Sequence, residues 1–126
     1  MKLIKTILLI ALTIPVINSP AWAEKEYSDQ QIANAIYQAE GGKNAKYPYG
    51  IRSVKCSGNS DCLRICLTTI RNNRIRYAEY GRRRYNSFIA FLASRYAPIK
   101  ADNDPKALNR NWIKNVNYFL NKEKSK

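Results

Sequence analysis

Residues 28–42 read SDQQIANAIYQAEGG, and the interpretation of the whole chain starts from this stretch. Ser28 and Gln31 form an S-x-x-Q capping box, which predicts a helix that begins at Asp29. The helix is predicted to end at Glu40, because two glycines follow it directly. Its apolar residues recur at helical spacing and indicate one buried face. They are Ile32, Ala33, Ile36 and Ala39.

Glu40 falls inside the apolar arc of this helix. At about 100° per residue it projects between Ile36 and Ala33, so we expect its side chain to point inward or into a cleft. The negative end of the helix dipole and desolvation both disfavour the charged carboxylate. A carboxyl that keeps its proton suits a general acid, and Glu40 is the predicted catalytic residue. The competing interpretation is a Glu that bends out to solvent or pairs with a nearby Lys or Arg.

Residues 1–23 have the pattern of a cleavable signal peptide. Lys2 and Lys5 precede an apolar stretch, and Ala21-Trp22-Ala23 is an A-x-A cleavage site. We therefore expect export to the periplasm or the extracellular space, with an uncleaved anchor as the alternative. The remaining residues, 24–126, are enough for one compact domain with a modest core.

The chain is strongly basic, with 22 Lys and Arg residues against 9 Asp and Glu residues and a net charge of +13. Such a surface favours polyanions, which include anionic wall polymers, membrane surfaces and nucleic acid. Tyrosines are interleaved with the densest basic runs, residues 71–76 and 82–84, as in some nucleic-acid-binding proteins. A solvated helix face is the favoured interpretation, and export argues against DNA as the partner. We expect a monomer.

The absence of histidine and the three cysteines limit the possible chemistry. Ser-His-Asp and Cys-His mechanisms are excluded, and so are imidazole and four-thiolate metal sites, so no metal or cofactor is expected. In an exported chain two of the cysteines should form a disulfide. Cys56 and Cys62 bracket a short loop and are the predicted pair, while Cys66 is predicted to be a small buried hydrophobe.

The rest of the chain predicts a mainly helical α+β domain. Residues 43–56 are expected to be non-helical, with Ile51 and Val54 in a short strand or hairpin after the first helix. A long helix is predicted from Asn59 or Ser60 to about Tyr80, and a third from about Ser87 to Tyr96. A fourth helix is predicted to start at Asp104-Pro105, followed by a basic tail at residues 121–126.

This order of segments resembles the lysozyme-like superfamily, and most closely its soluble lytic transglycosylases. Residues 39–42, AEGG, resemble the E-S-G segment that holds the catalytic Glu of that family. Residues 49–51, YGI, lie where the family has a G-L-M-Q segment and are similar to the F-G-I-K of bacterial glucosaminidases. Residues 95–116 resemble small lysozyme-like proteins of bacteria and phages, in which an aromatic residue near the fourth helix faces the Glu. The G-L-M-Q and A-Y-N-x-G strings themselves are absent.

The resemblance implies an exported peptidoglycan-cleaving enzyme, a lytic transglycosylase that acts on the MurNAc-GlcNAc bond with Glu40 as its single catalytic carboxylate. It implies that Tyr49 and Tyr96 belong to the cleft, with Tyr96 as a hydrogen-bond partner that orients Glu40. Tyr47, an aromatic residue beside a turn, is a further candidate for sugar binding. The alternatives are a non-enzymatic cationic module that binds wall glycans or another polyanion, a hydrolytic lysozyme or glucosaminidase, and a nucleic-acid-binding protein.

Overall fold

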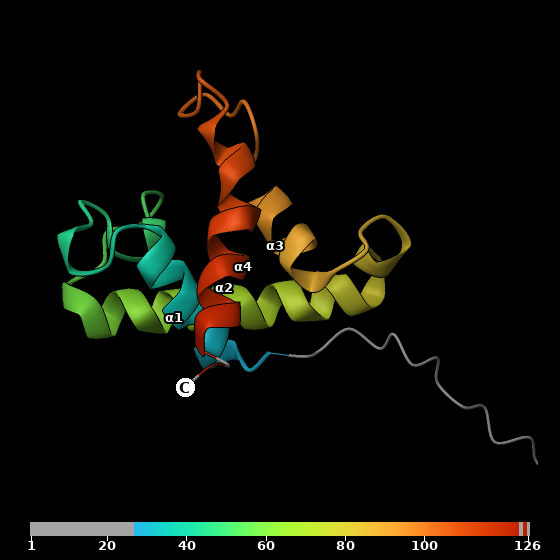
Figure 1. Ribbon diagram of the computed structural model, residues 1–126, viewed down its shortest axis with the longest axis horizontal. Helices are drawn as coiled ribbons and strands as arrows, with labels where there is room; N and C mark the ends of the chain where they lie inside the picture. The colour runs from blue at the N-terminus through green and yellow to red at the C-terminus, as the bar shows by residue number, and fades with distance from the viewer. Residues whose placement is uncertain (1–26, 124, 126) are drawn as a thin grey trace, which may run out of the picture.

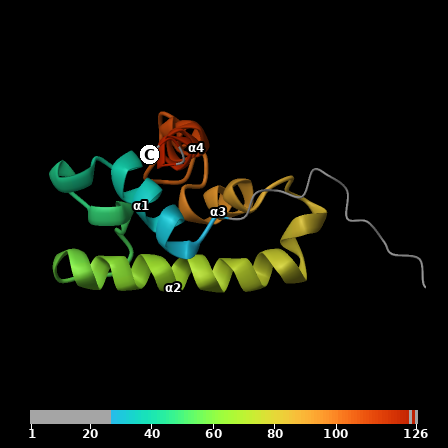
Figure 2. The same ribbon diagram turned by 60° about the horizontal axis from the view of Figure 1, so that its bottom comes forward.

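The computed structural model describes residues 27–123 and 125 of the chain, so the predicted signal peptide lies outside the described residues. The described part contains four α-helices: α1 (Asp29–Ala39), α2 (Gly58–Glu79), α3 (Phe88–Tyr96) and α4 (Trp112–Glu123). Short 3₁₀ turns, η1 (Gly42–Asn44), η2 (Pro48–Gly50), η3 (Gly81–Arg83) and η4 (Leu108–Asn111), lie between them. The long α2 runs along one side of the molecule, and the other three helices lie on its other side (Figures 1 and 2).

The mainly helical class is confirmed, but the predicted strand or hairpin after the first helix does not form. No residue from 27 to 123 belongs to a β-strand. Ile51 follows the η2 turn in a loop, and Val54 is 49% exposed. An isolated two-stranded hairpin is marginal in water unless its apolar face is covered. The Val54 side chain is not covered by other residues in this way. Only one residue separates Val54 from Cys56, where the disulfide ties the chain to α2.

The first helix begins and ends where the capping signals place it. The Ser28 hydroxyl accepts a hydrogen bond from the Gln31 backbone N–H at 3.1 Å, and the Gln31 side chain accepts one from the Ser28 N–H at 2.9 Å. At the other end Glu40 is the C-cap, and its N–H donates to the Ile36 carbonyl at 2.9 Å. Gly41 then takes a left-handed φ of 109°, which glycine adopts without steric strain.

The second and third helices also match their predicted ranges, whereas the fourth begins later than predicted. Asp104 does not open a helix. Its buried carboxylate accepts backbone N–H groups from Lys100 at 3.2 Å, Leu108 at 2.6 Å and Asn109 at 3.2 Å. Ala107 has a left-handed φ of 52°, which interrupts any helix that would continue from Pro105. Residues 98–110 therefore form a loop that is closed around Asp104, and α4 starts at Trp112.

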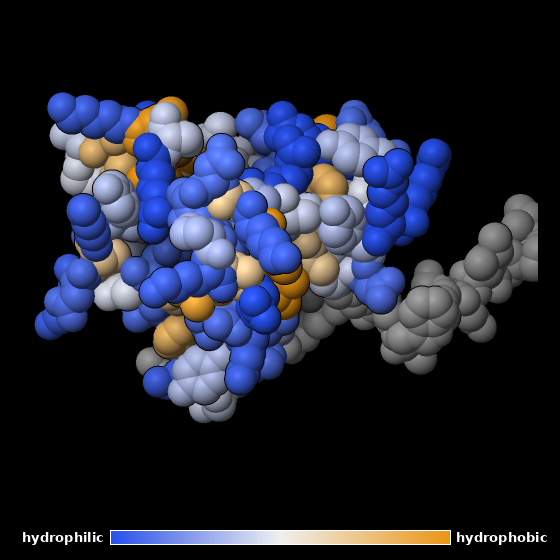
Figure 3. All heavy atoms as spheres, turned by 90° about the horizontal axis from the view of Figure 1, so that it is seen from above, coloured by the Kyte–Doolittle hydropathy of each residue, from blue (hydrophilic) through white to orange (hydrophobic). Residues whose placement is uncertain are grey.

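All four helices contribute to a single hydrophobic core. Cys66 lies in this core, as predicted. The basic run on α2 is partly used for fold stability, because Arg74 donates to Asp29 of α1 at 2.6 Å. Arg71 and residues 82–84 are exposed, which agrees with a solvated basic face. Figure 3 shows one face of the molecule as mostly hydrophilic side chains with scattered apolar ones. The fully buried side chains are Ile32, Ile36, Cys62, Cys66, Ile70, Leu92, Val116 and Leu120.

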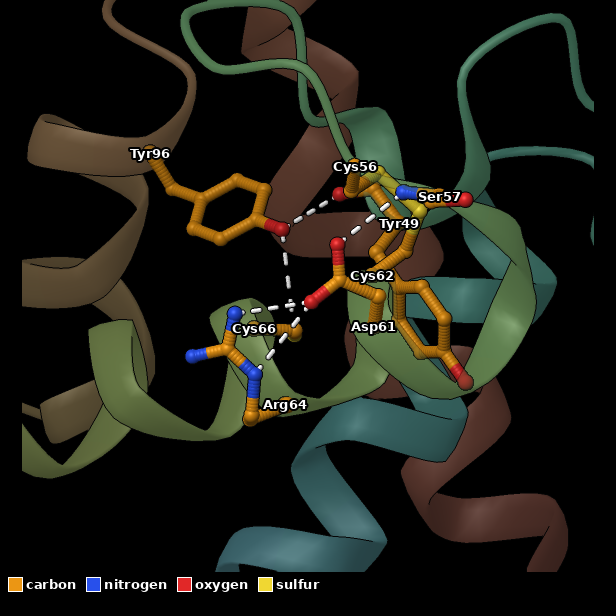
Figure 4. Close-up of a disulfide and its surroundings, with 8 residues drawn as sticks. All are labelled: Tyr49, Cys56, Ser57, Asp61, Cys62, Arg64, Cys66 and Tyr96. Atoms are coloured by element: carbon orange, nitrogen blue, oxygen red, sulfur yellow. Dashed lines mark hydrogen bonds and ion pairs between the residues drawn. A yellow bond between two sulfur atoms is a disulfide. The ribbon is translucent and has the colours of Figure 1, made fainter.

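The predicted disulfide between Cys56 and Cys62 is present, with 5.1 Å between the two Cα atoms (Figure 4). It joins the loop that follows η2 to the first turns of α2. Asp61 strengthens the same junction, because its carboxylate accepts the Ser57 N–H at 3.0 Å and pairs with Arg64 at 2.7 Å. The loop that carries residues 50–53 is thus anchored on the long helix close to its N-terminus.

Candidate active site

The end of α1 opens into a cleft of about 270 Å³ that contains Glu40. The other walls come from the loop after η2, the end of α3 and the loop closed around Asp104. Glu40 itself is half-buried, so its carboxyl can be reached from the cleft. The residues that line the cleft are Glu40, Gly50, Arg52, Ser53, Arg95, Tyr96, Ala97, Pro98, Asn103 and Asn109.

Trp112, the first residue of α4, holds the Glu40 carboxyl by a hydrogen bond. Its indole Nε1–H donates to Glu40 Oε1 at 3.1 Å, across 72 positions of the sequence. Trp112 is buried, and a buried indole N–H needs an acceptor. Its ring packs beside that of Tyr96, with 5.5 Å between the ring centroids. The hydrogen bond fixes the carboxyl in place and helps to stabilise its charged form.

The Tyr49-Gly50 turn covers the carboxyl from a second side. A Cβ atom at Gly50 would lie 2.7 Å from Glu40 Cδ and 2.8 Å from Oε1, so any other residue at this position would displace the carboxyl from its present place. Both residues of the turn are left-handed, with φ of 58° at Tyr49 and 67° at Gly50. The Tyr96 hydroxyl donates to the Tyr49 carbonyl and so anchors the turn to α3 (Figure 4).

Burial raises the pKa of Glu40 above its ordinary value. The hydrogen bond from Trp112 and the positive charge of Arg52 both act to lower that pKa, and the effect of burial is the larger one. The carboxyl therefore holds its proton at a higher pH than a solvated Glu does. It also has a hydrogen-bond donor and a cation nearby that favour the carboxylate once the proton has left.

The predicted site residues are distributed differently from expectation. Tyr96 lines the cleft, but its hydroxyl bonds to the Tyr49 carbonyl, and the donor to Glu40 is Trp112 instead. Tyr49 is 7% exposed, and its ring packs against that of Tyr37 in α1, with 5.1 Å between the ring centroids. Tyr49 therefore serves the site through its backbone, not through its ring.

Tyr47 lies outside the set of residues that line the cleft. Tyr47 is 39% exposed, and two cations lie over its ring, Lys46 Nζ at 5.4 Å and Arg52 Cζ at 5.1 Å from the ring centroid. Tyr47 thus helps to place Arg52, which does line the cleft. Its connection to the site is through that neighbour.

Two residues of the site, Trp112 and Gly50, were not predicted as functional. Trp112 fitted the apolar face of the last helix, and the resemblance implied only that an aromatic near that helix faces the Glu. A sequence signal did exist, because a Trp in a core position brings an N–H that must find an acceptor. Gly50 could be recognised from the sequence only as a glycine in a turn. That pattern does not indicate which side chain lies against the turn.

The Cys66 thiol is close to the site but is not suited to act as a nucleophile. The Tyr96 hydroxyl lies 3.8 Å from its Sγ atom, and burial raises the pKa of Cys66 to about 11 (Figure 4). A thiol with such a pKa stays protonated near neutral pH, and only the thiolate is reactive. Its part in the site is packing beneath Tyr96.

Among the described residues that line the cleft, Glu40 is the only carboxylate, whereas Arg52 and Arg95 are both cationic. Within residues 27–123, no group of three or more His, Cys, Asp and Glu side chains is placed to hold a metal ion. None of the helices in this range is long and apolar enough to cross a membrane.

A scan against protein-family models, a search of curated proteins and a search of solved structures each found no match.

Proposed function

We propose that this chain is an exported peptidoglycan-cleaving enzyme of the lysozyme-like type, a lytic transglycosylase that acts on the MurNAc-GlcNAc bond. The observation that carries the proposal is the setting of Glu40. It is a half-buried carboxyl at the mouth of a polar cleft, its pKa is raised by burial, and Trp112 holds it in one orientation. A general acid needs these properties, because it must hold its proton at a higher pH than a solvated Glu does and must be fixed in one place.

The reaction follows from one carboxyl group that acts twice. Protonated Glu40 gives its proton to the glycosidic oxygen as the bond from the muramyl C1 atom to that oxygen breaks. The carboxylate that results then takes the proton of the muramyl 6-hydroxyl, whose oxygen bonds to C1 and closes an anhydro ring. Glu40 ends protonated again, so no water is consumed. Trp112 and Arg52 favour the carboxylate in the interval between the two transfers.

The composition of the cleft supports this mechanism over hydrolysis by two carboxylates. Such hydrolysis needs a second carboxylate at roughly 5 to 10 Å from the first. The described residues that line the cleft provide no second one. The strongly basic surface supports the same substrate, because it would keep the enzyme on anionic peptidoglycan and on the polymers attached to it.

Digestion of purified peptidoglycan tests the proposal. The chain from Glu24 onward is incubated with peptidoglycan, and the soluble muropeptides are analysed by mass spectrometry. Two variants are run beside it: Glu40→Gln, which removes the acid, and Glu79→Gln, which makes the same change at an exposed position at the end of α2. Circular dichroism confirms that all three proteins are folded.

Anhydro products, lighter than hydrolytic ones by one water, are expected from the parent and from Glu79→Gln but not from Glu40→Gln. Products with hydrated reducing ends that depend on Glu40 would show that the enzyme is a lysozyme or a glucosaminidase and not a transglycosylase. An absence of products from the folded parent would overturn the proposal of an enzyme and favour a module that binds wall glycans.

A further inference from the structure

The cleft beside Glu40 has an excess of positive charge, of which the proposed mechanism uses only the effect of Arg52 on the Glu40 carboxylate. Arg52 and Arg95 line it from two different elements, the loop after η2 and the end of α3. Both residues are exposed. Apart from Glu40, the remaining polar residues of the lining are neutral: Ser53, Asn103 and Asn109.

These two arginines differ from three arginines of α2, Arg64, Arg71 and Arg74, each of which pairs with an aspartate. Arg64 pairs with Asp61 at 2.7 Å, and Arg74 and Arg71 lie 2.6 Å and 3.6 Å from the carboxylate oxygens of Asp29. No ion pair within residues 27–123 joins Arg52 or Arg95 to a carboxylate. The chain thus uses its aspartates on α1 and α2 and leaves the two cleft arginines available to a ligand.

The surroundings of the two arginines favour a ligand that is both sugar-like and anionic. Arg52 is held over the Tyr47 ring at 5.1 Å, which limits its freedom. The Asn109 amide donates to the Pro98 carbonyl at 2.9 Å, so the part of the wall that comes from the loop before α4 is also fixed. A guanidinium presents a planar set of donors that matches a carboxylate, and neutral amides and a hydroxyl suit sugar hydroxyls.

We infer that the cleft recognises a carboxylate carried by the glycan next to the bond that is cleaved, and that Arg95 and Arg52 bind this carboxylate. The inference rests on the proposed function and specifies its substrate. Uncharged glycans should therefore be poor substrates. In peptidoglycan the carboxylate has two sources, the lactyl group of a muramyl residue without its peptide, or the peptide stem itself.

Three glycan substrates distinguish the sources: peptide-free strands with free lactyl carboxylates, the same strands with those carboxylates converted to neutral amides, and strands with intact peptide stems. Chitin oligosaccharides serve as an uncharged glycan without lactyl groups. Arg95→Gln is the primary variant, because Arg52 also acts on the pKa of Glu40 and its loss would change catalysis as well as binding. Arg83→Gln, on the exposed η3 turn, is the matched control.

We expect Arg95→Gln to raise KM for the carboxylate-bearing strands by about ten- to a hundredfold, the range for a lost hydrogen bond to a charged group, with a smaller change in kcat. Arg95→Lys should recover part of the loss, because it keeps the charge without the planar fork. Arg83→Gln should behave as the parent does. A parent preference for peptide-free acid strands over amide strands assigns the lactyl carboxylate, and a preference for stem-bearing strands alone assigns the peptide.

Equal cleavage of neutral and anionic glycans by the parent, or an unchanged KM in Arg95→Gln, would overturn the inference while leaving the transglycosylase intact. If the parent cleaves no glycan, the proposed function fails, and recognition is then measured directly. Calorimetric titration of the same strands into the parent and into Arg95→Gln should show binding that the variant loses. Equal binding by the two proteins would contradict the assignment of Arg95.

Discussion

The Glu40 carboxyl is confined by the Tyr49-Gly50 turn, and the substitution Gly50→Ala tests how closely. The new methyl group would lie 2.7 Å from Glu40 Cδ, and the residue would have to adopt a φ of 67°. We expect a loss of about 1 to 2 kcal/mol from the left-handed backbone and a further 1 to 3 kcal/mol from the clash. Cleavage should fall sharply, because the carboxyl must move. Urea denaturation and muropeptide release measure the two effects.

Gly58 provides a matched control for this substitution. It also has a positive φ, 74°, but a Cβ built there meets no atom within 4 Å. Gly58→Ala should therefore lose only the backbone part of the stability and keep full cleavage activity. If the two variants lose the same stability and the same activity, the carboxyl is not confined by Gly50.

A second prediction concerns the hydrogen bond from Trp112. The substitution Trp112→Phe removes the N–H donor at 3.1 Å while keeping an aromatic ring. Because this bond lowers the pKa of Glu40, its loss should raise that pKa further. NMR titration of a chain labelled with ¹³C at its Glu carboxyl groups measures the change, and the other Glu resonances serve as internal controls. The alkaline limb of the pH profile of kcat/KM should move to higher pH by the same amount.

A pKa of Glu40 that falls in Trp112→Phe would contradict this prediction. It would mean that water enters the space left by the indole and relieves the desolvation that raises the pKa. The other Glu resonances should not move in either case.

For single residues, the sequence predicts features that depend on neighbours along the chain and misses contacts between residues that are far apart in the sequence. The inward direction of Glu40 follows from the phase of its own helix, and the Cys56-Cys62 pair from a short loop. The donor to Glu40 is 72 residues away, and no local pattern marks such a partner. Tyr49 is predicted as a cleft residue, and no local pattern marks that its backbone is left-handed and that its ring packs against Tyr37 of α1.

Among the elements, the loop of residues 98–110 depends on one carboxylate. Asp104 is 5% exposed and accepts three backbone N–H groups, from Lys100, Leu108 and Asn109. In Asp104→Asn one acceptor oxygen becomes a donor that faces other donors, and we expect a loss of about 1 to 3 kcal/mol in the free energy of unfolding. Because Asn103 and Asn109 line the cleft, KM should also rise.

Asp102→Asn is the control for this variant, because it makes the same change at an exposed position of the same loop. It should leave both stability and KM near the parent values. A thermal-denaturation series with the three proteins decides the matter. Equal effects of the two substitutions would indicate a general charge effect on this basic protein instead of a specific role for Asp104.

The elements were predictable where a cap or a glycine stop is encoded next to them. Ser28 and Ser87 both cap helices through their hydroxyls, and α1 and α3 start as expected. The Asp104-Pro105 pair has the same local signature as a helix start, but its carboxylate is satisfied by loop N–H groups on both sides. A capping residue indicates that its side chain will accept hydrogen bonds from nearby backbone N–H groups. Those N–H groups can belong to a loop as well as to the first turn of a helix.

For the whole molecule, the site exists only when the complete fold is assembled. Its walls come from the end of α1, the loop after η2, the end of α3 and the loop before α4, which together span most of the described chain (Figure 1). The long α2 does not line the cleft, but it supports α1, α3 and the loop after η2, through the core, the disulfide and the Arg74-Asp29 pair. Loss of global stability should therefore abolish the site as a unit.

The raised pKa of Glu40 also makes a prediction about the stability of the whole protein. A carboxyl whose pKa is higher in the folded state than in the unfolded state binds its proton more tightly when folded. It contributes stability below the unfolded pKa, and this contribution is lost as pH rises through the folded pKa. Above the folded pKa the ionised Glu40 is thus a net burden on the fold. Glu40→Gln should then be more stable than the parent at neutral pH and close to it in acid.

Thermal denaturation from acidic to neutral pH checks this, with Glu79→Gln as the exposed counterpart that should follow the parent throughout. The glutamine oxygen can still accept the Trp112 N–H, so the variant changes the charge and little else. A stability gain that grows with pH, together with loss of cleavage, would mean that the fold sacrifices stability to keep an acid in the cleft. A Glu40→Gln variant less stable than the parent at every pH would mean that the carboxylate is a structural partner, which argues against its role as the catalytic acid.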